Sequence, residues 1–527
     1  MGSKGSATGE TKRVRHTKVE KGRSRIRRCA RQAFSGVIPF LITCIVLGWA
    51  SAASAKKGVY DWAFVRLDYA RRDKVQTLEK FCDRIHNLAR QAARDKSVVG
   101  CFDVNLQYAA MVEKGGVPEV LSETVEKMRE NFNRYYIEKY FSFYDILFVD
   151  REGRVFYTLR KESDINQNLV RGNPVSGPLA ECLRGEPREE AFVDFHDYGP
   201  SSKPAAFFVE PIHKDGTLLG WVILQCAVNK VNTLFAWEEN LGQTGETFLV
   251  NRNGFMLTES NFDGDSTILK KRLDDRNIQA KFSEGQGHRV VTDYRGCTAL
   301  TSFEVVHFLG THWLVVAKVD RDEIVTQHYI NHRTYYADQL LASLRGASVP
   351  SLRRLQGFSM DGLRVDMDEF LKANKGESLY TIGIATCTGL LVAYPGRFAY
   401  LAHVSTRDRV YGAGDTNLLG QVVKQVKSFD IRPCEKRRIV FVAVANHLDS
   451  LLAVVDKLVA EGFLLSQIRV SYNPGAASAA VRYDYQEELF AVGWRMDGVL
   501  NGFHLMEDTL NVGEVVEGII YKEEKES

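Results

Sequence analysis

The feature that most constrains this chain is an uncharged, largely apolar segment near its N-terminus, residues 34–55. An α-helix needs about 20 such residues to cross the hydrocarbon core of a membrane, and this segment has 22. Before it, residues 1–32 hold 11 Lys and Arg, and basic flanks stay on the cytoplasmic side. We therefore predict a cytoplasmic tail over 1–32, one transmembrane helix over 33–55 and an extracytoplasmic remainder.

Two other interpretations of this end of the chain have to be weighed. A cleaved signal peptide is the rival to a membrane anchor, because residues 50–55 (ASAASA) provide small residues at A-x-A spacing. The basic tail does not indicate a nucleic-acid partner. The whole chain has a formal net charge of +3, so the remainder is mildly acidic, and no aromatic residues alternate with the basic ones.

The next part of the chain has the pattern of a long helix followed by two similar modules. Apolar residues at three- and four-residue spacing, without Pro or Gly, predict one amphipathic helix over 61–93. Residues 144–159 and 245–260 each contain an apolar run, a turn and a second apolar run, which is typical of a β-hairpin. This repetition predicts two α/β modules in series between residues 100 and 320.

Three stretches in this part carry a family resemblance: residues 194–212, residues 241–260 with the block TGETFLVN, and residues 292–296 with TDYRG. In this order, after a long helix, they resemble the double Cache sensor domains of bacterial chemoreceptors and sensor kinases. The resemblance covers residues 56–325 and implies two PAS-like (Cache) lobes, of which the membrane-distal one binds a small organic ligand. It also implies a role in signal transduction and a place in the bacterial inner (cell) membrane.

Candidate ligand-binding residues in the distal lobe are Asp194, Tyr198 and Phe208. A few polar groups on an apolar wall are typical of a small-molecule pocket. The alternative is that Asp194 caps a turn while Tyr198 and Phe208 belong to the core. The chain lacks the Arg-x-Trp-Tyr stretch with which such domains hold amino acids, so the resemblance does not identify the ligand.

The C-terminal part follows a linker over residues 326–375 and is predicted to be a compact α+β domain over 376–527, because short apolar strands alternate with helical stretches. Within it, Cys387 and His403 lie on two apolar runs separated by a Pro-Gly turn. On neighbouring strands the pleat lets their side chains face one another, and an imidazole activates a thiol as a nucleophile. The alternative is that Cys387 is a small buried hydrophobe and His403 is only hydrogen-bonded.

The order Thr381, Cys387, His403 resembles the motif of the CheD-type chemoreceptor glutamine deamidases, and the likeness extends over residues 376–500. It implies a cysteine-dependent amidohydrolase without a cofactor, in which Cys387 is the nucleophile, His403 its base and Thr381 orients His403. The implied partner is a protein substrate or a chemoreceptor-like protein of chemotaxis. Ala385 and Thr386 stand where that family has Gly-Ser, so a CheD-like domain that only docks a signalling partner is the alternative.

The predicted fold class is therefore α+β: an N-terminal transmembrane helix, a long stalk helix with two Cache lobes, and a compact CheD-like cysteine hydrolase domain. The nine cysteines form no CxxC motif and no Cys/His cluster, which argues against a structural metal. Cys82 and Cys101 are the plausible disulfide outside the last domain, and the sequence does not decide whether it forms.

Overall fold

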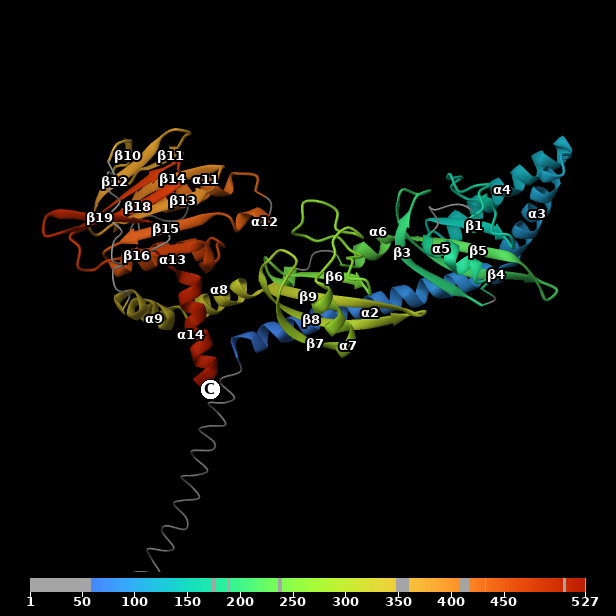
Figure 1. Cartoon of the computed structure of the whole chain (residues 1–527), viewed down its shortest axis with the longest axis horizontal. Helices are drawn as coiled ribbons and strands as arrows, with labels where there is room; N and C mark the ends of the chain where they lie inside the picture. Colours follow the sequence, from blue (N-terminus) through green and yellow to red (C-terminus); the bar gives the residue numbers. More distant parts are fainter. Residues whose placement is uncertain are drawn as a thin grey trace, which may run out of the picture. The chain divides into compact units, whose positions relative to one another are not determined.

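The computed structural model describes residues 58–171, 177–187, 189–235, 239–346, 360–406, 417–431, 433–505 and 509–526 (Figure 1). Residues Val59–Ile519 belong to one compact unit. The first element is a 36-residue helix, α2 (Val59–Arg94), and its buried residues recur at three- and four-residue spacing, as at Ala63, Leu67 and Ala70. The helix predicted over 61–93 is confirmed. It contacts strands of both sheets that follow it, β4 in the first and β8 and β9 in the second.

The predicted fold class needs one correction. In the part of the chain that the structure describes, no helix is both long enough and apolar enough to cross a membrane. Even α2, at 36 residues, carries charged residues throughout, and its mean hydropathy is too low for a hydrocarbon environment. The segment 33–55 lies outside the described residues, as does the tail 1–32. What the structure describes is an α+β protein.

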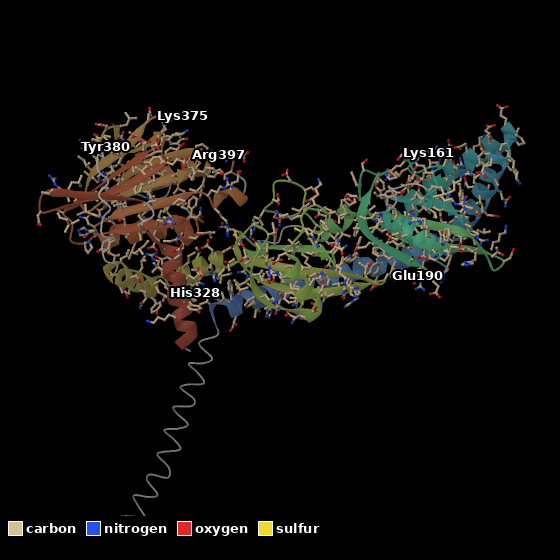
Figure 2. All side chains as sticks on the ribbon, viewed as in Figure 1. Lys161, Glu190, His328, Lys375, Tyr380 and Arg397 are labelled. Carbon is tan, nitrogen blue, oxygen red and sulfur yellow. The ribbon has the colours of Figure 1, made fainter. Side chains whose placement is uncertain are left out.

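The first lobe is a five-stranded antiparallel sheet in the order β2-β1-β5-β4-β3. The hairpin predicted over 144–159 is present, since β1 and β2 pair antiparallel. Two helices, α3 and α4, precede the sheet, and α3 contacts β2. Glu190, labelled in Figure 2, binds Arg90 of α2 at 2.8 Å beside this sheet. The elements are α3 (Lys96–Glu113), α4 (Glu119–Lys139), β1 (Asp145–Asp150), β2 (Val155–Thr158), α5 (Gly177–Arg184), β3 (Ala191–Tyr198), β4 (Lys203–Lys214) and β5 (Thr217–Ala227).

The second lobe is a four-stranded antiparallel sheet in the order β6-β9-β8-β7, with helix α7 packed on β7 and β8. The second predicted hairpin is only partly formed: after β6 the chain makes isolated bridges, such as Val250 with Met256, rather than a second strand. The elements are α6 (Val228–Asn232), the 3-10 turns Thr233–Phe235 and Glu239–Leu241, β6 (Glu246–Asn251), α7 (Asp275–Glu284), β7 (Gln286–Thr292), β8 (Thr298–Phe308) and β9 (Thr311–Asp320).

The region predicted as a linker over 326–375 contains regular structure. It includes most of helix α8 (Arg321–Asn331), helix α9 (Arg333–Gly346) and the short strands β10 (Leu363–Arg364) and β11 (Phe370–Ala373). Each of these two strands pairs with a strand of the C-terminal domain, β10 with β12 and β11 with β14. The strands of that domain therefore begin before residue 376.

The C-terminal domain has two sheets, one of five strands in the order β10-β12-β17-β18-β19 and one of six in the order β11-β14-β13-β15-β16-β20. An apolar core joins them, with Leu379 and Val481 from the first sheet and Leu391 and Leu401 from the second. Helices α11 and α13 pack on the six-stranded sheet. The remaining elements are β12 (Ser378–Ile384), β13 (Thr388–Tyr394), β14 (Phe398–Val404), α11 (Leu418–Lys427), α12 (Pro433–Lys436), β15 (Val440–Ala445), α13 (Leu448–Ala460), a 3-10 turn (Leu465–Gln467), β16 (Ile468–Tyr472), β17 (Ser478–Asp484), β18 (Leu489–Met496), β19 (Val499–Leu505), β20 (Leu510–Asn511) and α14 (Val512–Glu526).

Candidate functional site

The candidate site of the C-terminal domain lies between its two sheets, where Thr381 of β12 meets His403 of β14. The Oγ1 atom of Thr381 is 2.7 Å from Nδ1 of His403, a hydrogen bond from one sheet to the other. Thr381 is fully buried and His403 is 4% exposed. Because Nδ1 is held by Thr381, the other ring nitrogen, Nε2, is the atom left for chemistry. It is buried and has no hydrogen-bond partner among the described residues.

Gly389 allows the two sheets to approach closely at this point. It pairs with His403 across β13 and β14. A Cβ atom at Gly389 would lie 2.5 Å from Cδ1 of Ile384 and 3.3 Å from a methyl group of Val481, both on the facing sheet. A larger residue would therefore displace at least the end of the Ile384 side chain, which belongs to the same strand as Thr381.

Cys387 comes directly before β13 and two residues before Gly389. Side chains two residues apart on a strand point to the same face, so Cys387 lies diagonally from His403 on the inner face of its sheet. This placement agrees with the packing, since Cys387 belongs to the core between the sheets and is 6% exposed. The structure thus brings Thr381, His403 and Cys387 to one region, with no hydrogen bond between Cys387 and His403.

Burial sets the protonation of both reactive groups. It raises the pKa of the Cys387 thiol above its ordinary value, while the Thr386 hydroxyl and the backbone of Thr406 partly oppose that rise. Burial also lowers the pKa of His403, with Asp368 opposing it. Near neutral pH the pair is therefore a neutral thiol and a neutral imidazole. An imidazole in this state accepts a proton during the reaction, rather than holding a preformed ion pair.

Alkylation of Cys387 by iodoacetamide is expected to be slow near neutral pH and to accelerate as the pH rises past the ordinary thiol pKa. The thiolate is the reactive form, and burial disfavours it. The measurement is the labelling rate of Cys387, followed by mass spectrometry of its peptide across a pH series. Rapid labelling that is already independent of pH near neutrality would show a preformed thiolate and contradict this description.

Two further residues lie next to Cys387, and the sequence analysis did not find them: Ser450 holds its loop and Asn446 lies beside it. Ser450 of α13 donates a hydrogen bond to the Thr386 carbonyl at 2.7 Å. Asn446 directly follows β15, the neighbour of β13 on the side away from β14. Gly389 pairs with Val444, so the same antiparallel register places Asn446 opposite Cys387. Its Nδ2 donates to the Ala476 carbonyl at 3.0 Å, and its Oδ1 is buried without a hydrogen-bond partner. Only the register of β13 and β15 reveals this neighbour.

The structure also shows how helices α13 and α11 begin. His447 precedes α13 as its N-cap residue, without a side-chain cap bond. Asn417 caps α11 through its side chain, which accepts from the N–H of Gly420 at 2.6 Å. Cys82 and Cys101 are both buried free thiols in the structure.

The three residues predicted to bind a ligand in the first lobe do not share one surface. Tyr198 and Phe208 belong to separate apolar clusters on opposite faces of the five-stranded sheet. Tyr198 donates to Oδ2 of Asp164 at 2.8 Å. Asp194 accepts from the indole N–H of Trp313 at 2.9 Å, and burial raises its pKa to about 6. Their role in ligand binding stays a prediction.

Comparison with known families gives one match. The model of the Cache domain family, dCache_1, matches residues 68–328, which contain α2 from residue 68 onwards and both lobes. The sensor domain expected from the sequence is confirmed for this part of the chain. A comparison with curated proteins found no match.

Several solved structures are similar to about half of this chain. The ligand-binding domain of Mlp24 with asparagine is 13% identical with a TM-score of 0.35, covering 50% of this chain and 97% of its own. For the domains of the Pseudomonas aeruginosa PAO1 amino acid chemoreceptors PctC with GABA and PctB with L-Gln, identity is 14% and 17%, and each TM-score is 0.32. They cover 48% and 54% of this chain and 98% of their own. At these levels none of them decides what this chain binds.

Proposed function

We propose that this chain, which carries a Cache domain over residues 68–328, senses a small molecule with that domain and hydrolyses an amide with its C-terminal domain. The observation that supports the second half is the buried hydrogen bond between Thr381 and His403, with Cys387 on the same face as the imidazole. The proposed reaction is deamidation of a glutamine side chain in a protein. Where the chain lies in the cell stays a prediction from its basic tail.

Each residue has a distinct task in the proposed reaction. The reaction uses the tautomer of His403 in which Nδ1–H donates to the Thr381 hydroxyl and Nε2 is the base; the contact between Nδ1 and Thr381 is compatible with it. Nε2 takes the proton of the Cys387 thiol while the sulfur attacks the carboxamide carbon. The tetrahedral intermediate then expels ammonia, which receives the proton from Nε2, and a thioester remains. Water, deprotonated by Nε2, attacks the thioester, so that a carboxylate leaves and the thiol regains its proton.

The burial of the site favours a substrate whose reacting group is a neutral amide over one that brings a charge into the site. Cys387 and His403 are both buried, and a neutral carboxamide enters a buried site at lower cost than an ion. Backbone N–H groups near Thr386 and Cys387 are the donors predicted for the oxyanion, a contribution of about 3 kcal/mol for each donor. Ser450 fixes the Thr386 carbonyl and thereby the orientation of this loop.

The experiment that tests the proposal is an assay of the full chain with a panel of glutamine-containing proteins and peptides. The expected result is release of ammonia together with conversion of glutamine to glutamate in the substrate, detected by mass spectrometry. Free glutamine, which carries charges beside its amide, serves as the poor substrate. Absence of ammonia release from every member of the panel, at any pH from 6 to 9, would contradict the proposal.

A second candidate function has its own support. The missing hydrogen bond between Cys387 and His403, and the raised pKa of the thiol, suit a domain that only docks a signalling partner. Hydrogen bonds between catalytic groups are often long in proteins without substrate, so we place this candidate second. A partner that binds the wild type and the Cys387→Ala variant equally, with no ammonia release, would favour it.

A further inference from the structure

Helix α7 covers a cavity on the sheet of the second Cache lobe. The cavity has a volume of about 130 Å³. Its apolar wall includes Phe248 of β6, Ile278 of α7 and Val316 of β9. Asn277 and Lys281 line it from the same helix. Asn277 and Ile278 lie four and three positions before Lys281, so each of them shares the helix face of Lys281.

Lys281 is the unusual member of this wall. It is 5% exposed, and no hydrogen bond or ion pair involves its ammonium group among the described residues. Its Nζ atom lies 5.6 Å from the centre of the Phe303 ring. The nearby Glu284 is paired with Arg289. The side chain is buried as a whole, but Nζ is not among the buried atoms that lack a partner, so the ammonium group is accessible from the cavity that Lys281 lines. A ligand carboxylate there would offset the partial desolvation of this charge.

The other charged residues of the cavity have partners. Lys318 lies 2.6 Å from Oδ2 of Asp293 and 3.1 Å from Oε1 of Glu246. Lys271 lies 3.3 Å from Asp263. At the mouth, Asp274 accepts from the N–H of Arg276, and Arg272 donates to the Asn253 carbonyl. Among the lining residues named here, Lys281 is therefore the cation with neither a hydrogen bond nor an ion pair from the described residues.

We infer that this cavity binds a small carboxylate, whose carboxylate group pairs with Lys281 and whose alkyl part lies against Phe248, Ile278 and Val316. A cavity of about 150 Å³ in another protein holds benzene, so the ligand has about six non-hydrogen atoms or fewer. Acetate, propionate and lactate meet both conditions. The inference deepens the proposed sensing function, on which it rests, and places the ligand in the second lobe rather than the first.

The protonation of Lys281 supports this assignment. Burial and, to a smaller extent, the nearby Arg289 lower its pKa to about 8, with Glu284 opposing them. A carboxylate beside the ammonium favours the charged form and raises the pKa again. At about pH 8.5, binding should therefore take up protons, whereas a ligand that avoids Lys281 should not change its protonation.

The experiment is calorimetric titration of the full chain with propionate, and with propionamide as the neutral analogue of the same shape. Wild type is expected to bind propionate and not propionamide. Lys281→Met keeps the volume of the side chain and removes the charge, and it should weaken propionate binding roughly ten- to hundredfold, as expected for a charged hydrogen bond. Lys270→Met is the matched control, because Lys270 is exposed and one residue from the cavity wall.

The variants also test folding and proton uptake. Lys281→Met should melt at or above the wild-type temperature, since it removes an unpaired buried charge. At about pH 8.5, titrations in two buffers of different ionisation enthalpy should show proton uptake in wild type and none in Lys281→Met. Undiminished propionate binding by Lys281→Met would overturn the inference, as would a wild type that binds none of acetate, propionate or lactate.

These outcomes separate the inference from the proposed function. A wild type that binds another metabolite but no short carboxylate would overturn the carboxylate site and leave the sensor intact. A wild type that binds no member of a broad metabolite panel would overturn both.

Discussion

Replacing His403 by alanine should lower the rate of ammonia release by the full chain roughly 10²- to 10⁴-fold near neutral pH, the usual contribution of a general base. The thiol of Cys387 is protonated there, because burial raises its pKa, so it needs a base during the reaction. His403 is the neighbour with a free, buried ring nitrogen. Wild-type activity should fall as the pH falls through the lowered pKa of His403.

Two variants separate this chemical role from packing. His403→Gln keeps a polar side chain of similar length that has no basic nitrogen, so it should be as inactive as His403→Ala. Thr381→Val keeps the shape of Thr381 and removes the hydrogen bond, and it should lower kcat by about fivefold, since one orienting bond is worth about 1 kcal/mol. A His403→Gln variant with wild-type activity and fold would rule His403 out as the base.

The sequence was a good guide wherever local pattern decides structure. The 3.6-residue period of residues 61–93 predicted α2, and the run-turn-run of residues 144–159 predicted the hairpin of β1 and β2. The placement of Thr381 beside His403 came from the resemblance, because these residues lie on different sheets and no sequence period joins them. The membrane helix over 33–55 was predicted from composition alone.

The ligand site could not be predicted in the same way. A register shift in β3 between Val193 and His196 reverses the alternation of its side chains, so Tyr198 falls on the face opposite Phe208. A sequence pattern does not show where such a bulge lies. The cavity beside Lys281 exists because α7 packs across the sheet, a tertiary contact that the sequence does not show. In the sequence, Lys281 is one lysine on an amphipathic helix.

Replacing Cys387 by alanine should have the largest effect, a loss of ammonia release to background, roughly 10³-fold or more. No other group at the site can form the thioester, and removing one sulfur atom from the core costs little volume. The variant should therefore fold as wild type does, with an unchanged circular dichroism spectrum. Cys182, partly buried in α5 of the first lobe, provides the matched control.

The measurement that tests the account most directly is ammonia release from glutamine-containing substrates by the wild-type full chain and by its Cys387→Ala and Cys182→Ala variants, at equal protein concentration. The account predicts that wild type and Cys182→Ala release ammonia at the same rate, while Cys387→Ala releases none above background. Ammonia release by Cys387→Ala at the wild-type rate would contradict it.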